Sequence, residues 1–188
     1  PTFLLGTTTG QTIRAQNNFT IGGAGNATID ANTYDPILDI DGGLTIGSGD
    51  TFSASNISAF NLGGNFTNNG AFTHNNGAIT LDTTNTSNIT SAGSMSFYNL
   101  TSTAAGKTIL FQAHNSNIPI ITIANILTIT GAMGNNINIR SDALGGRWLV
   151  NFATANSAVS YATLRDSGCA GGSLSVPYNI TNSGDGNN

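Results

Sequence analysis

A short recurring phrase constrains the fold of this 188-residue chain more than any other feature. The phrase is a small or polar residue (once Ile), a large apolar residue and then Thr, as in Asn18–Thr20 and Gly43–Thr45. Counting looser copies, its apolar positions recur every 18 to 25 residues, at Phe19, Leu44, Phe66, Ile89, Ile109, Leu127, Leu149 and Leu174. A near-constant period of this length is typical of a solenoid, in which each repeat forms one coil that stacks on the next.

Composition indicates that the coils are built from β-strands. All nine acidic residues are Asp, Lys107 is the only lysine, and good helix formers are scarce while Ile, Thr, Phe and Val are plentiful. Disorder is disfavoured because 38% of the residues are hydrophobic, only four are Pro, and the apolar residues fall in short runs. We therefore expect an all-β fold.

Short alternating runs between the anchors supply two or three strands per period, as one coil of a parallel β-solenoid requires. The sequence predicts about eight coils of roughly 22 residues in a single domain over residues 1–188. An antiparallel β-sandwich is the alternative, because Asn69–Gly70 and Asn76–Gly77 are type I′ hairpin signals. Residues 148–188 depart from the plain repeat and are expected to form terminal coils or a cap.

A parallel coil also explains the polar composition. Like residues stack on like, so an apolar core column is predicted inside the coils, formed by Phe19, Leu44, Phe66, Ile89, Leu127 and Leu149. Thr would form ladders outside. Asn and Gly would turn the corners, as at Asn68–Gly70, Asn75–Gly77 and Asn135–Asn136, because they tolerate positive φ.

Three phrases resemble the repeats of large bacterial surface proteins of the filamentous-haemagglutinin and autotransporter-passenger type: Gly64–His74, Ser96–Thr101 and Asn125–Gly131. The resemblance extends over roughly residues 18–168, through short and largely compositional motifs. It implies a right-handed parallel β-helix displayed outside the cell as an adhesin, stalk or fibre.

Charge excludes several classes of partner. The formal net charge is −4 and the five basic residues do not cluster in the sequence, so nucleic acid is not an expected partner. No apolar run reaches the length of a membrane span.

Cys169 is the single cysteine of the chain, so the sequence contains no disulfide framework. The first residue, Pro1, and the final Ser183–Asn188 stretch are typical of a piece of a longer, exported chain.

One acidic cluster is a candidate for chemistry. Four of the nine carboxylates lie at Asp30, Asp35, Asp39 and Asp41, and paired carboxylates could cleave or bind a polysaccharide. Asp39 and Asp41, two residues apart, would share one face of a strand. Together with Asp50 they are the calcium candidates, although Leu44 stands where an EF-hand loop needs Gly.

Other reactive residues receive structural interpretations. His74 and His114 have no ligand-spaced partner, and Cys169 is expected to be a small core or corner thiol. Eight Asn-x-Ser/Thr sequons are explained by corner and ladder roles, at Asn18, Asn26, Asn56, Asn65, Asn85, Asn88, Asn99 and Asn179. Thr101–Thr103 and Thr128–Thr130 fit an ice-binding pattern locally, but it does not recur once per period.

The expected function is a structural or adhesive segment of an exported, extracellular surface protein or fibre, without catalysis or a required cofactor. Open solenoid ends expose unpaired strand edges, so homo-oligomers or end-to-end fibres are expected. A cell-surface or carbohydrate ligand is a further expected partner. The alternatives are a carbohydrate-active β-helix that uses the Asp30–Asp41 cluster, and an ice-binding solenoid.

Overall fold

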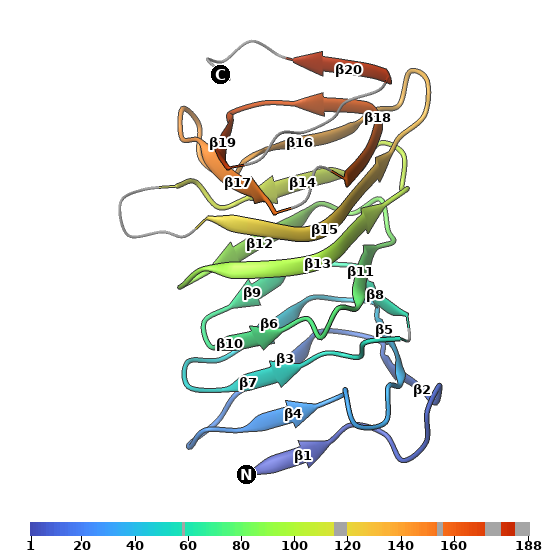
Figure 1. Cartoon of the computed structure of the whole chain (residues 1–188), viewed down its shortest axis with the longest axis vertical. Helices are drawn as coiled ribbons and strands as arrows, with labels where there is room; N and C mark the ends of the chain where they lie inside the picture. The colour runs from blue at the N-terminus through green and yellow to red at the C-terminus, as the bar shows by residue number, and fades with distance from the viewer. Residues whose placement is uncertain (58, 115–119, 154–155, 172–177, 183–188) are drawn as a thin grey trace.

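The computed structural model describes residues 1–57, 59–114, 120–153, 156–171 and 178–182, and every regular element in these ranges is a β-strand. The strands stack as successive rungs from the N-terminal end to the C-terminal end (Figure 1). Among the described residues all pairs between named strands are parallel, so the chain is a parallel β-solenoid and the antiparallel sandwich is excluded.

The first four rungs each contain three short strands on three faces. The first face is formed by β1 (Thr2–Leu4), β4 (Thr28–Asp30), β7 (Thr51–Ser53) and β10 (Ala71–Thr73). The second face is formed by β2 (Thr12–Ala15), β5 (Ile37–Ile40), β8 (Phe60–Leu62) and β11 (Ala78–Leu81). The third face is formed by β3 (Phe19–Ile21), β6 (Leu44–Ile46), β9 (Phe66–Asn68) and β12 (Ser87–Ser91).

The next rungs use longer strands. On two of them, β13 (Met95–Ser102) and β15 (Ile121–Thr130) run on to the second face, and β14 (Thr108–Phe111) and β16 (Ile137–Ser141) lie on the third. The stack then continues with β17 (Trp148–Phe152), β18 (Asn156–Leu164), β19 (Ser167–Gly171) and β20 (Tyr178–Asn182). Because β18 pairs with both β15 and β16, it joins the second and third faces into one sheet.

The solenoid has about six turns, slightly fewer than the eight coils predicted from the anchors. The anchors also do not stay on one face. Leu127 lies on the second face and Leu149 in β17, while Leu174 falls outside the described residues. Within residues 148–188, β17 to β20 continue the parallel pairing of the rungs before them.

The predicted core column is partly correct. Phe19, Leu44, Phe66 and Ile89 are in register on the third face, and Phe111 continues the column on β14. Leu127 is buried but belongs to a second-face column, where it follows Leu100. The prediction for Leu149 is wrong: alternation points Trp148 and Val150 inward, so Leu149 between them is only partly buried.

Aromatic rings fill the middle of the core. The Phe66 ring meets the Phe72 ring at a centroid distance of 5.1 Å and the Phe97 ring at 5.6 Å, both edge to face. Phe52 packs similarly on Phe60 at 5.9 Å. Near the C-terminal end, Trp148 stacks on Phe111 at 4.6 Å. These contacts join the three faces across the interior.

Asn and Gly turn the corners as expected. Asn75 and Asn76 have φ of 48° and 63°, and the Asn75 amide donates to the Ser53 hydroxyl and the Ala54 carbonyl on the previous rung, both at 2.8 Å. At Gly63, a Cβ would collide with the Asp41 carbonyl below, so close coil approach requires glycine there. Asn68 acts differently: its Oδ1 accepts the Gly70 N–H at 3.2 Å.

Candidate functional site

The acidic cluster divides into separate structural contacts. Asp39 and Asp41 share one outward face, as predicted, and both pair with Arg14 of the rung below. The Arg14 Nη2–Asp41 Oδ2 distance is 2.9 Å, and Arg14 Nε lies 3.4 Å from Asp39 Oδ2. The hydrogen bonds that Arg14 donates to Asp41, together with the charges of Asp41 and Asp39, raise the pKa of Arg14 above its ordinary value. Both carboxylates therefore share one cationic partner.

The other two members of the cluster stabilise turns. Asp30 Oδ1 accepts the Asn32 N–H at 2.8 Å, and its Oδ2 accepts the Thr33 hydroxyl at 2.6 Å. Asp35 sits at φ 44° and accepts the Asn56 N–H at 2.8 Å, from the next rung. Each of the four carboxylates thus has a structural contact, which weakens the case for an acid–base pair.

Asp50 does not join Asp39 and Asp41 in a calcium site. It is buried in the turn between β6 and β7, with 2% of its surface exposed, and Oδ1 accepts the Ala27 N–H at 2.8 Å. No group of three or more His, Cys, Asp or Glu side chains suited to a metal ion occurs in the described ranges. Asp50 instead stabilises the contact between two rungs.

Lys107 has a structural role that the sequence did not indicate, beyond its being the single lysine of the chain. Its side chain is fully buried, and Nζ donates to the Thr83 and Asn85 carbonyls at 2.9 and 2.7 Å. Burial lowers the pKa of Lys107 to about 8, opposed by the charge of Asp82. Conversely, partial burial raises the pKa of Asp82, and the Asp39 charge adds to the rise. Lys107 therefore fastens the β11–β12 turn.

The two histidines and the cysteine belong to different parts of the chain: His74 follows β10, His114 follows β14 and Cys169 is in β19. His74 stacks on Tyr98 at 5.6 Å, and its Nδ1 accepts the Asn76 N–H at 2.9 Å. Burial lowers the pKa of His74. His114 is exposed, immediately before residues 115–119, which lie outside the described part. Cys169 lies in β19, whose pairing with β17 places Cys169 opposite Val150.

Several sequon asparagines connect adjacent rungs, as the ladder interpretation predicted. Asn18 Oδ1 accepts the Gly43 N–H and Asn65 Oδ1 accepts the Asn88 N–H, both at 2.8 Å. Asn99 Oδ1 accepts the Asn125 amide at 2.9 Å. Asn18 and Asn65 each lie two residues before a member of a ladder of outward threonines on the third face, formed by Thr20, Thr45, Thr67 and Thr90.

Two threonine pairs singled out in the sequence stack directly on each other. Thr101 faces Thr128 on the next rung, and Thr80 lies below Thr101. Two residues after Thr128, Thr130 faces Ser160 on the following rung. We call these stacked residues the hydroxyl array: Thr80, Thr101, Thr128, Thr130 and Ser160. The structure thus extends the local pattern over several rungs of the second face.

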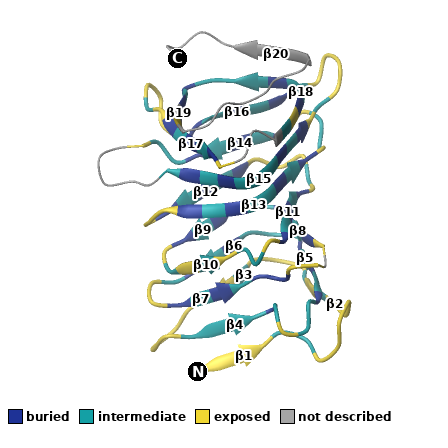
Figure 2. Ribbon diagram, in the orientation of Figure 1, coloured by how far each residue is buried: buried dark blue, intermediate teal, exposed yellow. Residues whose placement is uncertain are grey.

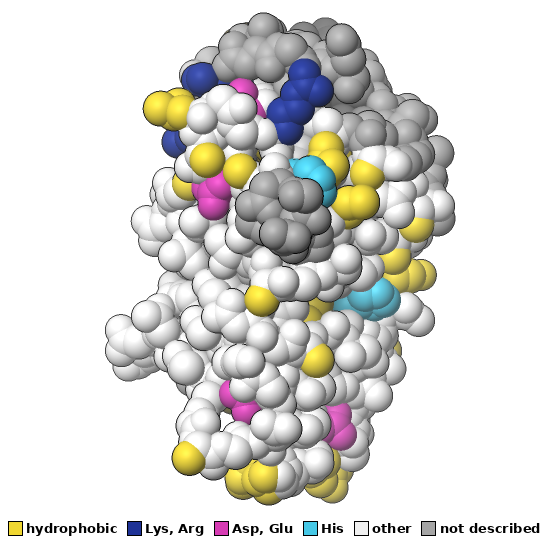
Figure 3. All heavy atoms as spheres, turned by 90° about the vertical axis from the view of Figure 1, so that its left-hand side faces the viewer, with side chains coloured by type: hydrophobic (Ala, Val, Ile, Leu, Met, Phe, Trp, Pro, Cys, Tyr) yellow, Lys and Arg dark blue, Asp and Glu magenta, His cyan; other side chains and the backbone are white. Residues whose placement is uncertain are grey.

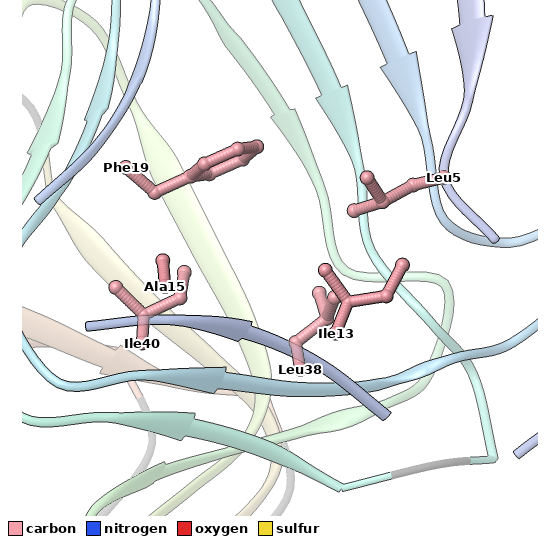
Figure 4. A pocket seen from close by; sticks show the side chains of 6 residues that line it. All are labelled: Leu5, Ile13, Ala15, Phe19, Leu38 and Ile40. Atoms are coloured by element: carbon pink, nitrogen blue, oxygen red, sulfur yellow. The ribbon is translucent and has the colours of Figure 1, made fainter. Parts of the chain in front are cut away.

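The N-terminal end leaves the core open. There Phe3 and Leu4 are 54% and 51% exposed, and β1 forms the exposed base of the stack in Figure 2. Beside them an apolar recess opens between the faces (Figure 4). It is lined by Leu5, Ile13, Ala15, Phe19, Leu38 and Ile40. Ile13 faces Leu38, and Ala15 faces Ile40, so the inward side chains of the first rung are covered on one side only.

No family model matches the chain, and no curated protein or solved structure is significantly similar to it. The class of protein is therefore defined by the fold, a parallel β-solenoid. Within the described residues, no helix is long and apolar enough to cross a membrane.

Proposed function

We propose that the chain is a structural segment of an exported bacterial surface protein or extracellular fibre, without catalytic activity, that adds length and associates end to end. The open N-terminal end is the observation that carries this proposal. It displays three strand edges, β1 to β3, each paired on one side only, around the apolar recess. A further coil of the same kind would pair with the three strand edges and cover the apolar recess.

A second copy of this chain is the proposed occupant of that end. Contacts between rungs already repeat along the molecule, with parallel strands and apolar inward columns, so an added coil would continue an interface that exists. Low charge supports the same function, because charges stacked rung upon rung would repel. Attachment to a cell surface, or to a carbohydrate there, is the adhesive form of this proposal.

Ile13→Lys tests the end contact. Ile13 points into the recess, whereas its neighbour Thr12 is exposed, so Thr12→Lys adds the same charge outside the core. Sedimentation velocity and electron microscopy over rising concentration should show end-on oligomers for the wild type and Thr12→Lys, and monomers for Ile13→Lys. Wild-type monomers at all concentrations, or oligomers unaffected by Ile13→Lys, would contradict the proposal.

The hydroxyl array favours ice binding as a second candidate function. Thr80, Thr101 and Thr128 point outward from parallel strands on three successive rungs, at regular rung spacing. Thr101→Lys would break the array, whereas Thr67→Lys places the same change on the third face. Thermal hysteresis that disappears only in Thr101→Lys would support ice binding; no hysteresis in the wild type would reject it.

The carbohydrate-active alternative has a separate test. It would require Asp39 and Asp41 to act while paired with Arg14. Incubation with acidic polysaccharides should leave them intact. Cleavage abolished by Asp41→Asn would overturn the non-catalytic proposal.

A further inference from the structure

Two arginines lie side by side near the C-terminal end of the third face. Arg140 is in β16, and Arg165 immediately follows β18. Ile139 faces Leu164, and the Arg165 N–H donates to the Ile139 carbonyl at 2.9 Å, so the two arginines occupy neighbouring positions on adjacent rungs. In the view of Figure 3, the basic side chains gather in the upper, C-terminal part of the molecule.

This arrangement concentrates positive charge in a chain with few charges. Arg165 Nε lies 3.3 Å from Asp166 Oδ2, and Asp166 is buried. Arg140 forms no ion pair within the described ranges; its Nη1 donates to the Ser141 carbonyl at 3.2 Å. Asp142, two residues after Arg140, accepts the Ala113 N–H at 2.8 Å. Arg165 thus has a buried carboxylate beside it, whereas Arg140 has no carboxylate partner in the described ranges, and like charges stacked on a sheet repel.

The space around the two arginines is built from hydrogen-bonding groups. A recess of about 370 Å³ is lined by both arginines together with Thr108, Asn138, Ile139 and Thr163. Thr108 faces Asn138 directly, and Asn138 faces Thr163, so hydroxyl, amide and hydroxyl form one outward column beside the guanidinium groups. We call these residues the arginine recess.

We propose that the arginine recess binds a tetrahedral oxyanion, sulfate or phosphate, either free or esterified to a polysaccharide. Guanidinium groups present planar, paired donors that match the oxygens of such an anion, and the bonds are charge-assisted. The hydroxyls of Thr108 and Thr163 and the Asn138 amide supply further donors. A bound dianion would also relieve the repulsion between the arginines. The site is distinct from the open N-terminal end, so either proposal can fail alone.

Sulfate titration by calorimetry tests the site, with chloride holding the ionic strength constant. Arg140→Gln should weaken sulfate binding at least tenfold. Arg14→Gln is the matched control, because it removes the same charge from an exposed arginine at the opposite end, and it should leave sulfate binding unchanged. Equal binding by the wild type and Arg140→Gln, or no binding by the wild type, would overturn the proposal.

Thermal unfolding is a second test, because the wild type and Arg140→Gln should rank differently in melting temperature with and without sulfate. Without sulfate, Arg140→Gln should melt at the same or a higher temperature, since it removes a repulsion. Sulfate should raise the melting temperature of the wild type more than that of Arg140→Gln. The general stabilisation that sulfate gives by favouring buried surface should raise both melting temperatures equally. An equal gain in both proteins would count against the site.

The source of the oxyanion is distinguished by three probes: inorganic sulfate, inorganic phosphate and dextran sulfate, with neutral dextran as the control. Arg140-dependent binding of a free anion indicates a small-molecule site. Arg140-dependent binding of dextran sulfate alone indicates an ester on a polysaccharide. Binding of neutral dextran as strongly as dextran sulfate would contradict recognition of the anion.

Discussion

The lower rungs, β1 to β12, and the upper rungs, β13 to β18, turn their corners differently. In the lower rungs Asn or Gly marks the turns, as at Asn75, Asn76 and Gly63, and each face has its own short strand. In the upper rungs β13 passes the corner through an irregularity between Phe97 and Asn99, and β18 turns at Tyr161, with φ 49°. At these upper corners the strand itself continues through the bend.

The two regions also differ in charge and core. The lower rungs hold the in-register column from Phe19 to Ile89 and pair both Asp39 and Asp41 with Arg14. The upper rungs place Arg140 beside Arg165. The lower region thus pairs its arginine with carboxylates, whereas the upper region stacks two arginines on adjacent rungs.

Truncating the aromatic column should produce the largest loss. Phe66 is fully buried against Phe72 and Phe97, so Phe66→Ala should lower the free energy of unfolding by about 3–5 kcal/mol. Leu149→Ala, in the upper rungs, should cost about 1 kcal/mol, because Leu149 is only partly buried. Urea denaturation measures both. Equal losses would mean that Leu149 belongs to the core after all.

Lys107 should make stability depend on pH. Its pKa is about 8 in the folded chain, against an ordinary value of 10.5, so between these values the unfolded chain binds more protons and stability should rise with pH. The full rise is up to about 3 kcal/mol. Urea midpoints at pH 7.5 and 10.5 measure it.

Lys107→Met is the control for that pH dependence. It should remove this part of the rise while leaving the contribution of other groups, and should destabilise the chain by about 1–3 kcal/mol at pH 7, because the Thr83 and Asn85 carbonyls lose their donor. An unchanged pH profile in the variant would show that Lys107 is not its source.

Gly63→Ala tests the corners of the lower rungs. A Cβ at Gly63 would meet the Asp41 carbonyl, so the variant should lose about 1–3 kcal/mol of stability. Gly93→Ala is matched, because nothing lies within 4 Å of its added Cβ and its φ is not positive. Thermal melting of the two variants gives the comparison; similar melting temperatures would argue against close coil approach at Gly63.

Arg14→Gln should have the smallest effect on stability. Its ion pairs with Asp39 and Asp41 are largely exposed, and such pairs contribute little. The urea midpoint should not change measurably, and high salt should not alter that result. A clear decrease in the urea midpoint would show that the stability of the lower rungs depends on these ion pairs.

The repeat predicted the fold class because the pattern that produces a coil lies within a short stretch of sequence. Inward apolar residues, outward Thr and corner Asn or Gly are readable from spacing, and Phe19, Leu44, Phe66 and Ile89 stack as expected. The period did not show which face an anchor occupies, so Leu127 was placed on the wrong column and Leu149 was predicted to be inside. The number of residues at the corners varies from rung to rung, so the repeated phrase shifts from one face to another along the chain.

The candidate sites were less predictable for a related reason. Asp39 and Asp41 could be placed on one face, but Arg14 lies a whole rung earlier, so its pairing was invisible without the register. The same holds for Arg140 and Arg165, which are separated by a full coil in sequence. Lys107 gave no signal, because its carbonyl partners are backbone groups.

Disulfide trapping of stacked positions tests the parallel register most directly. In a Cys169→Ser background, the account predicts rapid oxidation of Thr45→Cys with Thr67→Cys, which face each other on adjacent rungs within reach of a disulfide. It predicts no disulfide between Thr67→Cys and Phe72→Cys, which an antiparallel hairpin across Asn69–Gly70 would pair. Mass spectrometry of digests distinguishes the two. A disulfide in the second pair and none in the first would contradict the solenoid.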